Sequence, residues 1–418
     1  MAGEWAKTRI QDIAKRTATG PFGSAISAKN FVGSGVPVIR GSNLSQSVST
    51  RLDDSGLIFD SKEKAREFSR SEVRQGDLVF TCWGTIDQVG LIDSRAKYDR
   101  YIVSNKQMLL TPDETKADSL FLYYYFASPE TRAKILNQGI GSSVPGFNLG
   151  QLRSFEVSLP PLPIQKAIAA ILGSLDDKID LNRRMNATLE AMARALFQSW
   201  FVDFDPVRAK RDGRQPPGLD SDTAALFPDS FQDAEIGRIP TGWDVVSLDA
   251  LASIRGGKQL PTEDCLDFGE FTVFGANGIM GYTKDFTHDG FVIAFGRVGA
   301  YCGSIHWSLK GAWINNNASA VVPMQWPVFV LQTMLNIDFS SMRTGSAQPF
   351  IPNSSLASAK VVRPSPPIAE AFCNIVEPFR RQQADNDHHP RPLTTLRDTL
   401  LPKLLSGEIR VSEAERHV

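Results

Sequence analysis

IQKAIAAILGSLDDKIDLNRRMNATLEAMARAL, residues 164–196, carries apolar side chains at alternating steps of four and three residues. This spacing is a heptad repeat, and it predicts a long helix with one apolar stripe that packs on a second helix. The positions of this seam are Ile164, Ile168, Ile171, Leu175, Lys178, Asn182, Met185, Leu189, Met192 and Leu196.

A second seam follows 204 residues later, and it too has apolar ends and a polar middle. Two such stripes in one chain are buried best against each other, so we expect two long, antiparallel, coiled-coil-like helices. The positions of the second seam are Ile368, Phe372, Ile375, Phe379, Gln382, Asn386, His389, Leu393, Leu396 and Leu400.

The polar middle of each seam holds one asparagine. A polar residue at a seam position lowers stability but fixes register, so Asn182 and Asn386 are candidate helix-pair register residues. The alternative is a weakly packed, hydrated middle section. Pro390 and Pro392 predict an interruption of the second helix, because proline breaks helices.

The globular parts of the chain are repeated as well. GDLVFTCWGTIDQVGLI (76–92) resembles GFVIAFGRVGAYCGSI (290–305), and each predicts a strand, a tight turn and a strand. Further matches lie at an offset of 238 residues near the domain starts and 204 near the domain ends: Trp5, Ile10 and Ile13 with Trp243, Leu248 and Leu251; Leu152 and Pro160 with Leu356 and Pro364.

The predicted fold class is therefore mixed α/β (α+β): two repeated globular domains separated by the two long helices, with pseudo-two-fold symmetry. Residues 206–239 are rich in Pro, Gly, Asp and Ser and predict a linker. The expected order is a first domain (1–160), a spacer helix (161–205), the linker (206–239), a second domain (240–363), and a second spacer helix with the tail (364–418).

Composition gives weaker constraints. The net charge of -1 carries no overall signature of nucleic-acid binding. The four cysteines form no CxxC pair, which indicates reduced thiols rather than a zinc site or a disulfide framework. No stretch has about 18 uninterrupted apolar residues and the start lacks a secretory h-region, so we expect a cytoplasmic protein with no membrane partner.

Motifs for catalysis are missing from the sequence. IRGGKQL (254–260) lacks the spacing of a phosphate loop, and GANGIMG (275–281) is interpreted as a turn rather than a cofactor loop. FDPV (204–207) lacks the second proline and the aromatic residue of an amino-methyltransferase motif, and is interpreted as a helix end. The five histidines form no metal-binding cluster. We expect no catalytic centre, no metal and no cofactor in this chain.

Several strings in order resemble the specificity (S) subunits of type I restriction-modification systems. They are the domain exit LPPLPIQKAIAAIL, the helix 175–204, the domain start PTGWDVVSLDALA and the tail LRDTLLPKLLSGEIRV (396–411). Two departures stand against the pattern: the insertion DNDHHPRP (385–392), and SPPIAEAF where the first copy has PLPIQKAI.

The resemblance implies a non-catalytic, sequence-specific DNA-binding subunit for host defence. Each domain would read one half of a bipartite, asymmetric target in double-stranded DNA. The helices would set the spacing, with residues 163–200 forming a rod of roughly 57 Å, and would dock two modification (methyltransferase) subunits and, through them, the restriction (motor-nuclease) subunits. S-adenosylmethionine, ATP and magnesium are expected in those partners.

Candidate DNA-binding residues are polar or aromatic side chains in Gly-rich loops, because Arg and Lys read guanine, and Asn and Gln read adenine. Ser142, Ser143, Ser346 and Gln348 are candidate phosphate contacts or caps. The candidates are Lys29, Asn30, Arg40, Ser42, Asn43, Trp83, Thr85, Asn105, Lys106 and Gln107 in the first domain, and Lys258, Gln259, Asn277, Arg297, Tyr301, Asn315, Asn316 and Asn317 in the second.

Two other classes remain open at this point. One is a structural adaptor whose helices recruit partners without contact to DNA. The other is a divergent DNA methyltransferase, which the missing motifs disfavour.

Overall fold

The computed structural model describes residues 5–23, 26, 28–141, 144–345, 348–388 and 390–417. The chain forms two compact units. Unit 1 comprises Met1–Asn182 and His389–Val418, and unit 2 comprises Arg183–His388. The long helix α6 (Leu162–Phe197) contributes residues to both.

Unit 1 is built on one sheet of four strands and one of five. The antiparallel four-stranded sheet has the order β2-β10-β7-β8, and the five-stranded sheet has the order β3-β5-β4-β9-β6 with β4 parallel to β9. Its helices are α1 (Ile10–Ile13), α2 (Lys62–Glu67), α3 (Ser119–Ala127), α4 (Pro129–Asn137) and α5 (Leu149–Ser154). Its strands are β2 (Ala14–Thr19), β3 (Phe31–Val32), β4 (Val36–Ile39), β5 (Ile58–Asp60), β6 (Glu72–Val73), β7 (Leu78–Thr81), β8 (Val89–Leu91), β9 (Tyr101–Val103) and β10 (Gln107–Pro112).

Unit 2 repeats the four-stranded sheet in the order β15-β21-β18-β19 and adds a three-stranded sheet, β17-β16-β20. The buried helix α9 occupies the place in chain order that α3 has in unit 1. The elements are β15 (Ala252–Gly256), β16 (Phe271–Gly275), β17 (Gly278–Thr283), β18 (Val292–Gly296), β19 (Ile305–Ser308), β20 (Ala312–Ile314), β21 (Ala318–Pro323), α9 (Pro327–Leu335) and α10 (Asn353–Ala357).

A two-stranded ribbon joins the start and end of each domain and confirms the repeat. In unit 1, β1 (Ala6–Arg9) pairs with β11 (Glu156–Leu159); in unit 2, β14 (Asp244–Ser247) pairs with β22 (Lys360–Arg363). Both ribbons are antiparallel and share one register, because Ala6 lies opposite Leu159 and Asp244 opposite Arg363. The sequence offsets of 238 and 204 residues relate these four strands.

The segment predicted as a linker is folded. After a π-helical turn (Gln198–Val202) it forms α7 (Asp205–Arg211), α8 (Ser221–Leu226) and the hairpin β12 (Phe231–Ala234) with β13 (Gly237–Pro240). Val207, Phe227 and Ile239 are buried in the unit 2 core. This folding could not be predicted from the sequence, because the helices are too short to show a period. The interpretation of residues 204–207 as a helix end is confirmed, since Phe204 has a left-handed backbone between the π-helical turn and α7.

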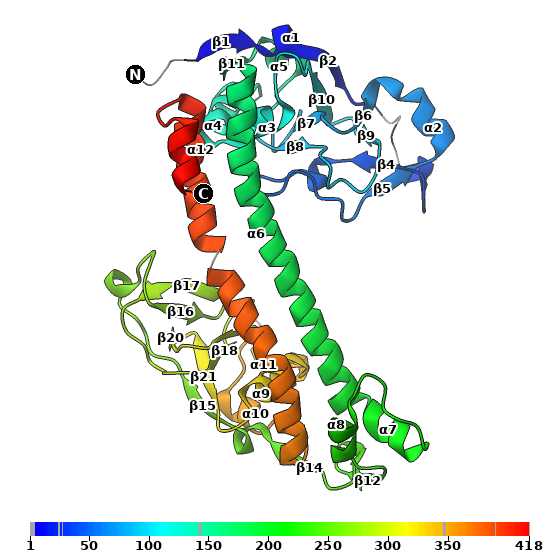
Figure 1. Ribbon diagram of the computed structural model, residues 1–418, viewed down its shortest axis with the longest axis vertical. Helices are drawn as coiled ribbons and strands as arrows, with labels where there is room; N and C mark the ends of the chain where they lie inside the picture. Colours follow the sequence, from blue (N-terminus) through cyan, green and yellow to red (C-terminus); the bar gives the residue numbers. More distant parts are fainter. Residues whose placement is uncertain are drawn as a thin grey trace. The chain divides into compact units, whose positions relative to one another are not determined.

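The predicted antiparallel helix pair is confirmed within unit 2, where α6 lies beside α11 (Pro366–His388; Figure 1). As numbers rise along α6, they fall along α11: Asn186 bonds to Gln383, Glu190 to Arg380, and the Phe197 ring meets Phe372. Within unit 1, α12 (Pro390–Ser406) packs on the first half of α6, and α13 (Val411–Ala414) follows.

The described part of the second spacer is helical on both sides of His389, and the interruption predicted at Pro390 and Pro392 stays a prediction. α11 ends at His388 and α12 begins at Pro390, with His389 outside the described residues.

The heptad phase predicted for the seams was wrong at alternate positions. Lys178, Met192, Ile375 and Gln382 are exposed, and the buried residues lie one position later, at Ile179, Ala193, Val376 and Gln383. A three-residue step from Ile168 fits the sequence as well as a four-residue step, because Ile171 and Leu172 are both apolar. In the packed helix the step after Ile168 is four residues, to Leu172, and not three, to Ile171.

Candidate nucleic-acid interface

Three loops of unit 1 are joined by backbone hydrogen bonds at one end of its four-stranded sheet. Cys82 N donates to Lys106 O (2.7 Å), Gly84 N to Pro145 O (3.0 Å) and Phe147 N to Cys82 O (2.9 Å). We call this group the unit 1 tip; it comprises residues 82–88, 104–107, 140–141 and 144–147. The bonds fix the loops relative to one another, so side chains that project from them are held in place.

Unit 2 repeats these bonds at equivalent positions. Arg297 N donates to Asn317 O (3.2 Å), Gly299 N to Pro349 O (2.8 Å) and Ile351 N to Arg297 O (3.0 Å). The unit 2 tip comprises residues 297–304, 315–318, 344–345 and 348–351. The two tips therefore have one backbone frame with different side chains.

A glycine brings a fourth loop against each tip. Gly20 N donates to Gln107 O (2.9 Å), and Gly257 N to Ala318 O (3.0 Å). A Cβ atom on Gly20 would overlap Ser104 O, and one on Gly257 would overlap Asn315 O. The second glycine of the string IRGGKQL, Gly257, thus serves a close backbone approach, which is a structural reason for it other than phosphate binding.

Most of the candidate residues in unit 1 are exposed. Trp83, Thr85, Asn105 and Lys106 lie on the tip itself. Ser42 is exposed on a 3₁₀ turn (Gly41–Asn43) whose Gly41 lies beside Gln107 and Gln88, so this turn borders the tip.

Three further unit 1 candidates do not lie on the tip loops. Lys29 is exposed and Asn30 half-buried on a 3₁₀ turn (Ala28–Asn30) that leads into β3. Arg40 is half-buried and donates to Gly56 O (3.4 Å).

The unit 2 candidates also gather at its tip. Tyr301, Asn316 and Asn317 are exposed on it. Arg297 is half-buried, donates through Nη2 to Asn316 O (2.9 Å) and lies 5.8 Å from the centre of the Phe350 ring.

Lys258, Gln259 and Asn277 are exposed on neighbouring loops. Lys258 N donates to Ile314 O (2.9 Å), which ties its loop to the strand that leads into the tip. Asn277 lies in the two-residue turn between β16 and β17, so the turn predicted in GANGIMG is confirmed, with strand residues on both sides of it.

Three candidates point inward and make internal hydrogen bonds. Asn43 donates to Asp53 O (3.0 Å) and Ser55 O (3.2 Å), Gln107 bonds to the Ser104 hydroxyl, and Asn315 accepts from Asn316 N (2.6 Å). All three are buried. Ser142, Ser143 and Ser346 lie outside the described residues, and Gln348 is exposed on the unit 2 tip.

The tips contain buried thiols in both units. Burial raises the pKa of Cys82 to about 12, and burial also raises the pKa of Cys302. A thiol with a raised pKa stays protonated and is a poor nucleophile. The tips therefore present hydrogen-bonding, cationic and apolar groups rather than a reactive centre.

Comparison with known proteins agrees with this arrangement. The family described as "Type I restriction modification DNA specificity domain" matches residues 2–191. The chain is 26% identical to the Type I restriction enzyme HindI specificity subunit of Haemophilus influenzae over 74% of this chain and 82% of that one. It is 23% identical to the MjaIX specificity subunit of Methanocaldococcus jannaschii over 98% of this chain and 94% of that one.

The chain belongs to the type I restriction-modification specificity subunits. Its fold is similar to the crystal structure of a type I S subunit from M. genitalium, with a TM-score of 0.67, 16% identity and 96% of each chain covered. A specificity subunit is a non-catalytic, DNA-binding part of a type I complex and assembles with the other subunits.

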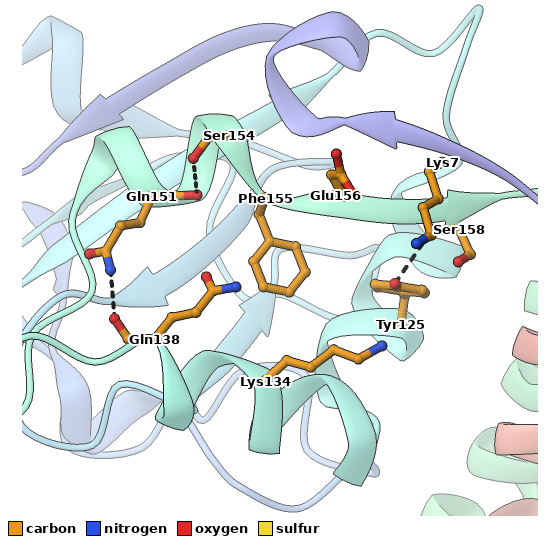
Figure 2. Close-up of a pocket in the computed structure, with 9 residues that line it drawn as sticks. All are labelled: Lys7, Tyr125, Lys134, Gln138, Gln151, Ser154, Phe155, Glu156 and Ser158. Atoms are coloured by element: carbon orange, nitrogen blue, oxygen red, sulfur yellow. Dashed lines mark hydrogen bonds between the residues drawn. The ribbon is translucent and has the colours of Figure 1, made fainter.

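The specificity subunit also has a cavity of about 580 Å³ in unit 1 that the sequence did not indicate (Figure 2). Lys134 and Gln138, at the end of α4, face Tyr125 and Phe155 across it. Its remaining lining residues are Lys7, Gln151, Ser154, Glu156 and Ser158. None of the candidate DNA-binding residues lines the cavity.

A buried charge network attaches the helices to the domain in unit 1. Arg397 of α12 pairs with Asp176 of α6 (2.7 Å), and both side chains are almost fully buried. Tyr124 donates its hydroxyl to the same carboxylate (2.6 Å), and Arg51 bridges Tyr124 (3.0 Å) and Asp93 (2.7 Å). Although burial alone would lower it, the pKa of Arg397 is raised by its bonds to Asp176.

Amide side chains take the corresponding place between the helices in unit 2. Asn386 donates to Asn186 Oδ1 (2.8 Å), and Gln383 donates to Asn186 O (3.0 Å). Asn182, the other candidate register residue, is buried. Beside the amides, Arg380 is buried, pairs with Glu190 and lies 5.5 Å from the centre of the Trp307 ring.

Neither a metal-binding group nor a membrane-spanning helix occurs among the described residues. No group of three or more His, Cys, Asp or Glu side chains in this part of the chain is arranged to hold a metal ion. Within the same residues, none of the helices combines the length and apolar character needed to span a membrane.

Proposed function

We propose that the unit 1 tip and the unit 2 tip each read one half of a bipartite, asymmetric target in double-stranded DNA. The recognition domains are residues 1–160 and 240–363. The observation that carries the proposal is the shared hydrogen-bond frame of the two tips, which holds different exposed side chains at matching positions.

The matching positions explain why two half-targets would differ. Asn105 and Lys106 in unit 1 correspond to Asn316 and Asn317 in unit 2, since Lys106 O and Asn317 O accept equivalent backbone bonds. Lysine favours guanine and the phosphate backbone, whereas asparagine favours adenine. The exposed candidates carry this proposal; Asn43, Gln107 and Asn315 are already occupied by internal bonds.

The helices would set the spacing of the half-targets and dock two modification subunits, and restriction subunits through them. The 36 residues of α6 make a rod of about 54 Å at about 1.5 Å per residue. S-adenosylmethionine, ATP and magnesium would be bound by those partners, and the complex would act in the cytoplasm on the chromosome and on invading DNA.

The test is methylome sequencing of a host that expresses this chain with its modification subunit, compared with a host lacking the chain. A split motif that depends on the chain is the expected result. Replacing residues 1–160 by the first domain of another specificity subunit should change one half of that motif. Complex formation without a chain-dependent motif would favour an adaptor, and a change in both halves would contradict modular reading.

A further inference from the structure

A three-stranded ladder of single bridges lies at the unit 1 tip. Gly146 is its centre: it pairs with Ile140 on one side and with Trp83 on the other. Ile140 and Gly146 exchange two backbone hydrogen bonds of 2.9 Å each. Residues directly opposite one another in antiparallel pairs project their side chains from the same face. Ile140 and Trp83 therefore share the face of the ladder on which Gly146 has no side chain.

The absence of a side chain at Gly146 lets the Trp83 ring lie over the backbone. A Cβ atom on Gly146 would come within 2.6 Å of the six-membered ring of Trp83. The ring is thus held against the ladder on one side, and little conformational freedom would be lost if the other side met a ligand.

Three large apolar side chains at this place remain exposed. Trp83 is 53% exposed, Ile140 58% and Val144, two residues before Gly146 in the same loop, 53%. We call these three residues the wedge. Single exposed apolar residues are common, but three on one short bonded frame mark an interaction site.

Unit 2 has the same ladder with a different surface. Phe350 is the centre, and it pairs with Val298 and Thr344. Its ring is half-buried with the Arg297 guanidinium over it, and Gln348 occupies the position of Val144. At the positions of Ile140 and Val144, unit 2 therefore exposes the polar residues Thr344 and Gln348, and its central ring is covered by a cation.

We propose that the wedge inserts against a base step of the unit 1 half-target and unstacks it, whereas unit 2 reads its half-target without this distortion. The inference rests on the proposed function, since it concerns the same tip. Apolar side chains that enter a groove kink the duplex most easily at flexible pyrimidine–purine steps. The half-target read by unit 1 therefore contains such a step, and that of unit 2 is free of this requirement.

The neighbours of the wedge favour DNA over a protein partner. Lys106 and Asn105 are exposed on the loop bonded to Cys82, which adjoins Trp83, and Thr85 follows in the same turn. A cation and amide groups beside an aromatic ring match a phosphate backbone with bases behind it. A protein-docking surface has its charges at the rim and few at the centre.

The test uses the complex of the specificity subunit with its modification subunits and a duplex that carries the target motif. 2-Aminopurine replaces, one at a time, each adenine that is not methylated. Binding of the wild-type complex should raise the 2-aminopurine fluorescence at one step of the unit 1 half-target and at no step of the other half-target. Trp83→Ala should abolish the rise and weaken binding roughly tenfold or more. Trp83→Phe should retain part of both effects.

Matched variants separate the possible outcomes. Val298→Ala, at the equivalent position of unit 2, should leave the fluorescence unchanged. Ile140→Asn changes the wedge without removing the ring, so it tests the inference again if Trp83→Ala folds poorly. A fluorescence rise that persists in both wedge variants, or none in wild type, overturns the inference. Normal DNA binding with loss of complex assembly assigns the wedge to a partner protein instead. If wild type shows no preference for the motif duplex, the proposed function itself fails.

Discussion

Unit 1 and unit 2 share a strand order, a ribbon register and a tip frame, yet they bury different polar groups beneath their helices. Unit 1 buries two complete charges, Asp176 and Arg397, with Tyr124 bonded to the carboxylate. Unit 2 buries the neutral amides Gln383 and Asn386, which bond to the half-buried Asn186, beside a single guanidinium.

The difference shows which features the duplicated fold requires. Backbone bonds at the tips and ribbons are the same in both units, so they define the scaffold. The anchors beneath the helices serve only to hold them in place, and either ions or amides can do this when every partner is bonded. The two units should therefore respond differently to the loss of an anchoring side chain.

The largest effect is expected in unit 1. Asp176→Ala leaves the Arg397 charge buried without its enclosed partner, and we expect the free energy of unfolding to fall by about 3–5 kcal/mol. Denaturant unfolding followed by circular dichroism measures this loss.

Asp398→Ala is the matched control, because Asp398 binds the same arginine at 2.6 Å with a side chain that is 53% exposed. An exposed pair contributes about 0–1 kcal/mol. Equal losses from both variants would show that the enclosed carboxylate has no special part in holding α12 to α6.

Reading of DNA should distinguish the two units next. Asn105→Ala and Asn316→Ala alter equivalent positions of the tips. Each should reduce discrimination at one base of its own half-target by about 1–3 kcal/mol, because a lost base contact acts locally. Binding of the assembled complex to duplexes with single substitutions measures this. Relaxation of both half-targets by one variant would contradict the assignment of one half-target to each unit.

The sequence predicted those features that repeat or have a long period. The offsets of 238 and 204 residues matched the starts and ends of the two domains, where the ribbons form, and the seams predicted the antiparallel helices. It could not set the seam phase, because Ile171 and Leu172 fit either choice, nor the folding of residues 206–239, whose elements are too short for periodicity.

The exposure of individual side chains at the tips could not be predicted from the sequence. Asn43, Gln107 and Asn315 were candidate DNA-binding residues because of their residue type, but all three side chains are buried. The apolar residues Ile140 and Val144 could not be predicted as interface residues, because their exposure depends on a ladder formed by residues distant in sequence.

Replacing the amides between α6 and α11 in unit 2 should change the free energy of unfolding less, and in the opposite direction. Replacing Asn186 and Asn386 together by leucine removes a bonded polar pair from between α6 and α11. We expect unfolding to become harder by about 1 kcal/mol, with looser register of the helices. Thermal unfolding tests the first part, and the spacer length in the methylome tests the second. A less stable double variant that retains a single spacer length would refute this role of the amides.

Mild acid should give the smallest effect, and it should arise in unit 2. Burial lowers the pKa of His306, whose ring stacks on Phe274 at 6.0 Å, and burial followed by the Arg255 charge lowers the pKa of His288. Below the unfolded value of about 6.5, the unfolded chain binds more protons than the folded one, so stability falls as the pH decreases. Above about pH 7 both states hold neutral rings and this dependence vanishes.

His306→Phe isolates the contribution of one ring, because it keeps an aromatic group against Phe274 but cannot bind a proton. Between pH 7 and pH 5.5, the free energy of unfolding should fall further in wild type than in the variant. The difference should be on the order of 1 kcal/mol or less. At pH 8 the two should respond equally to a change in pH. A variant whose stability falls as steeply as that of wild type would place the acid sensitivity elsewhere, and His288→Phe would then show whether the second ring supplies it.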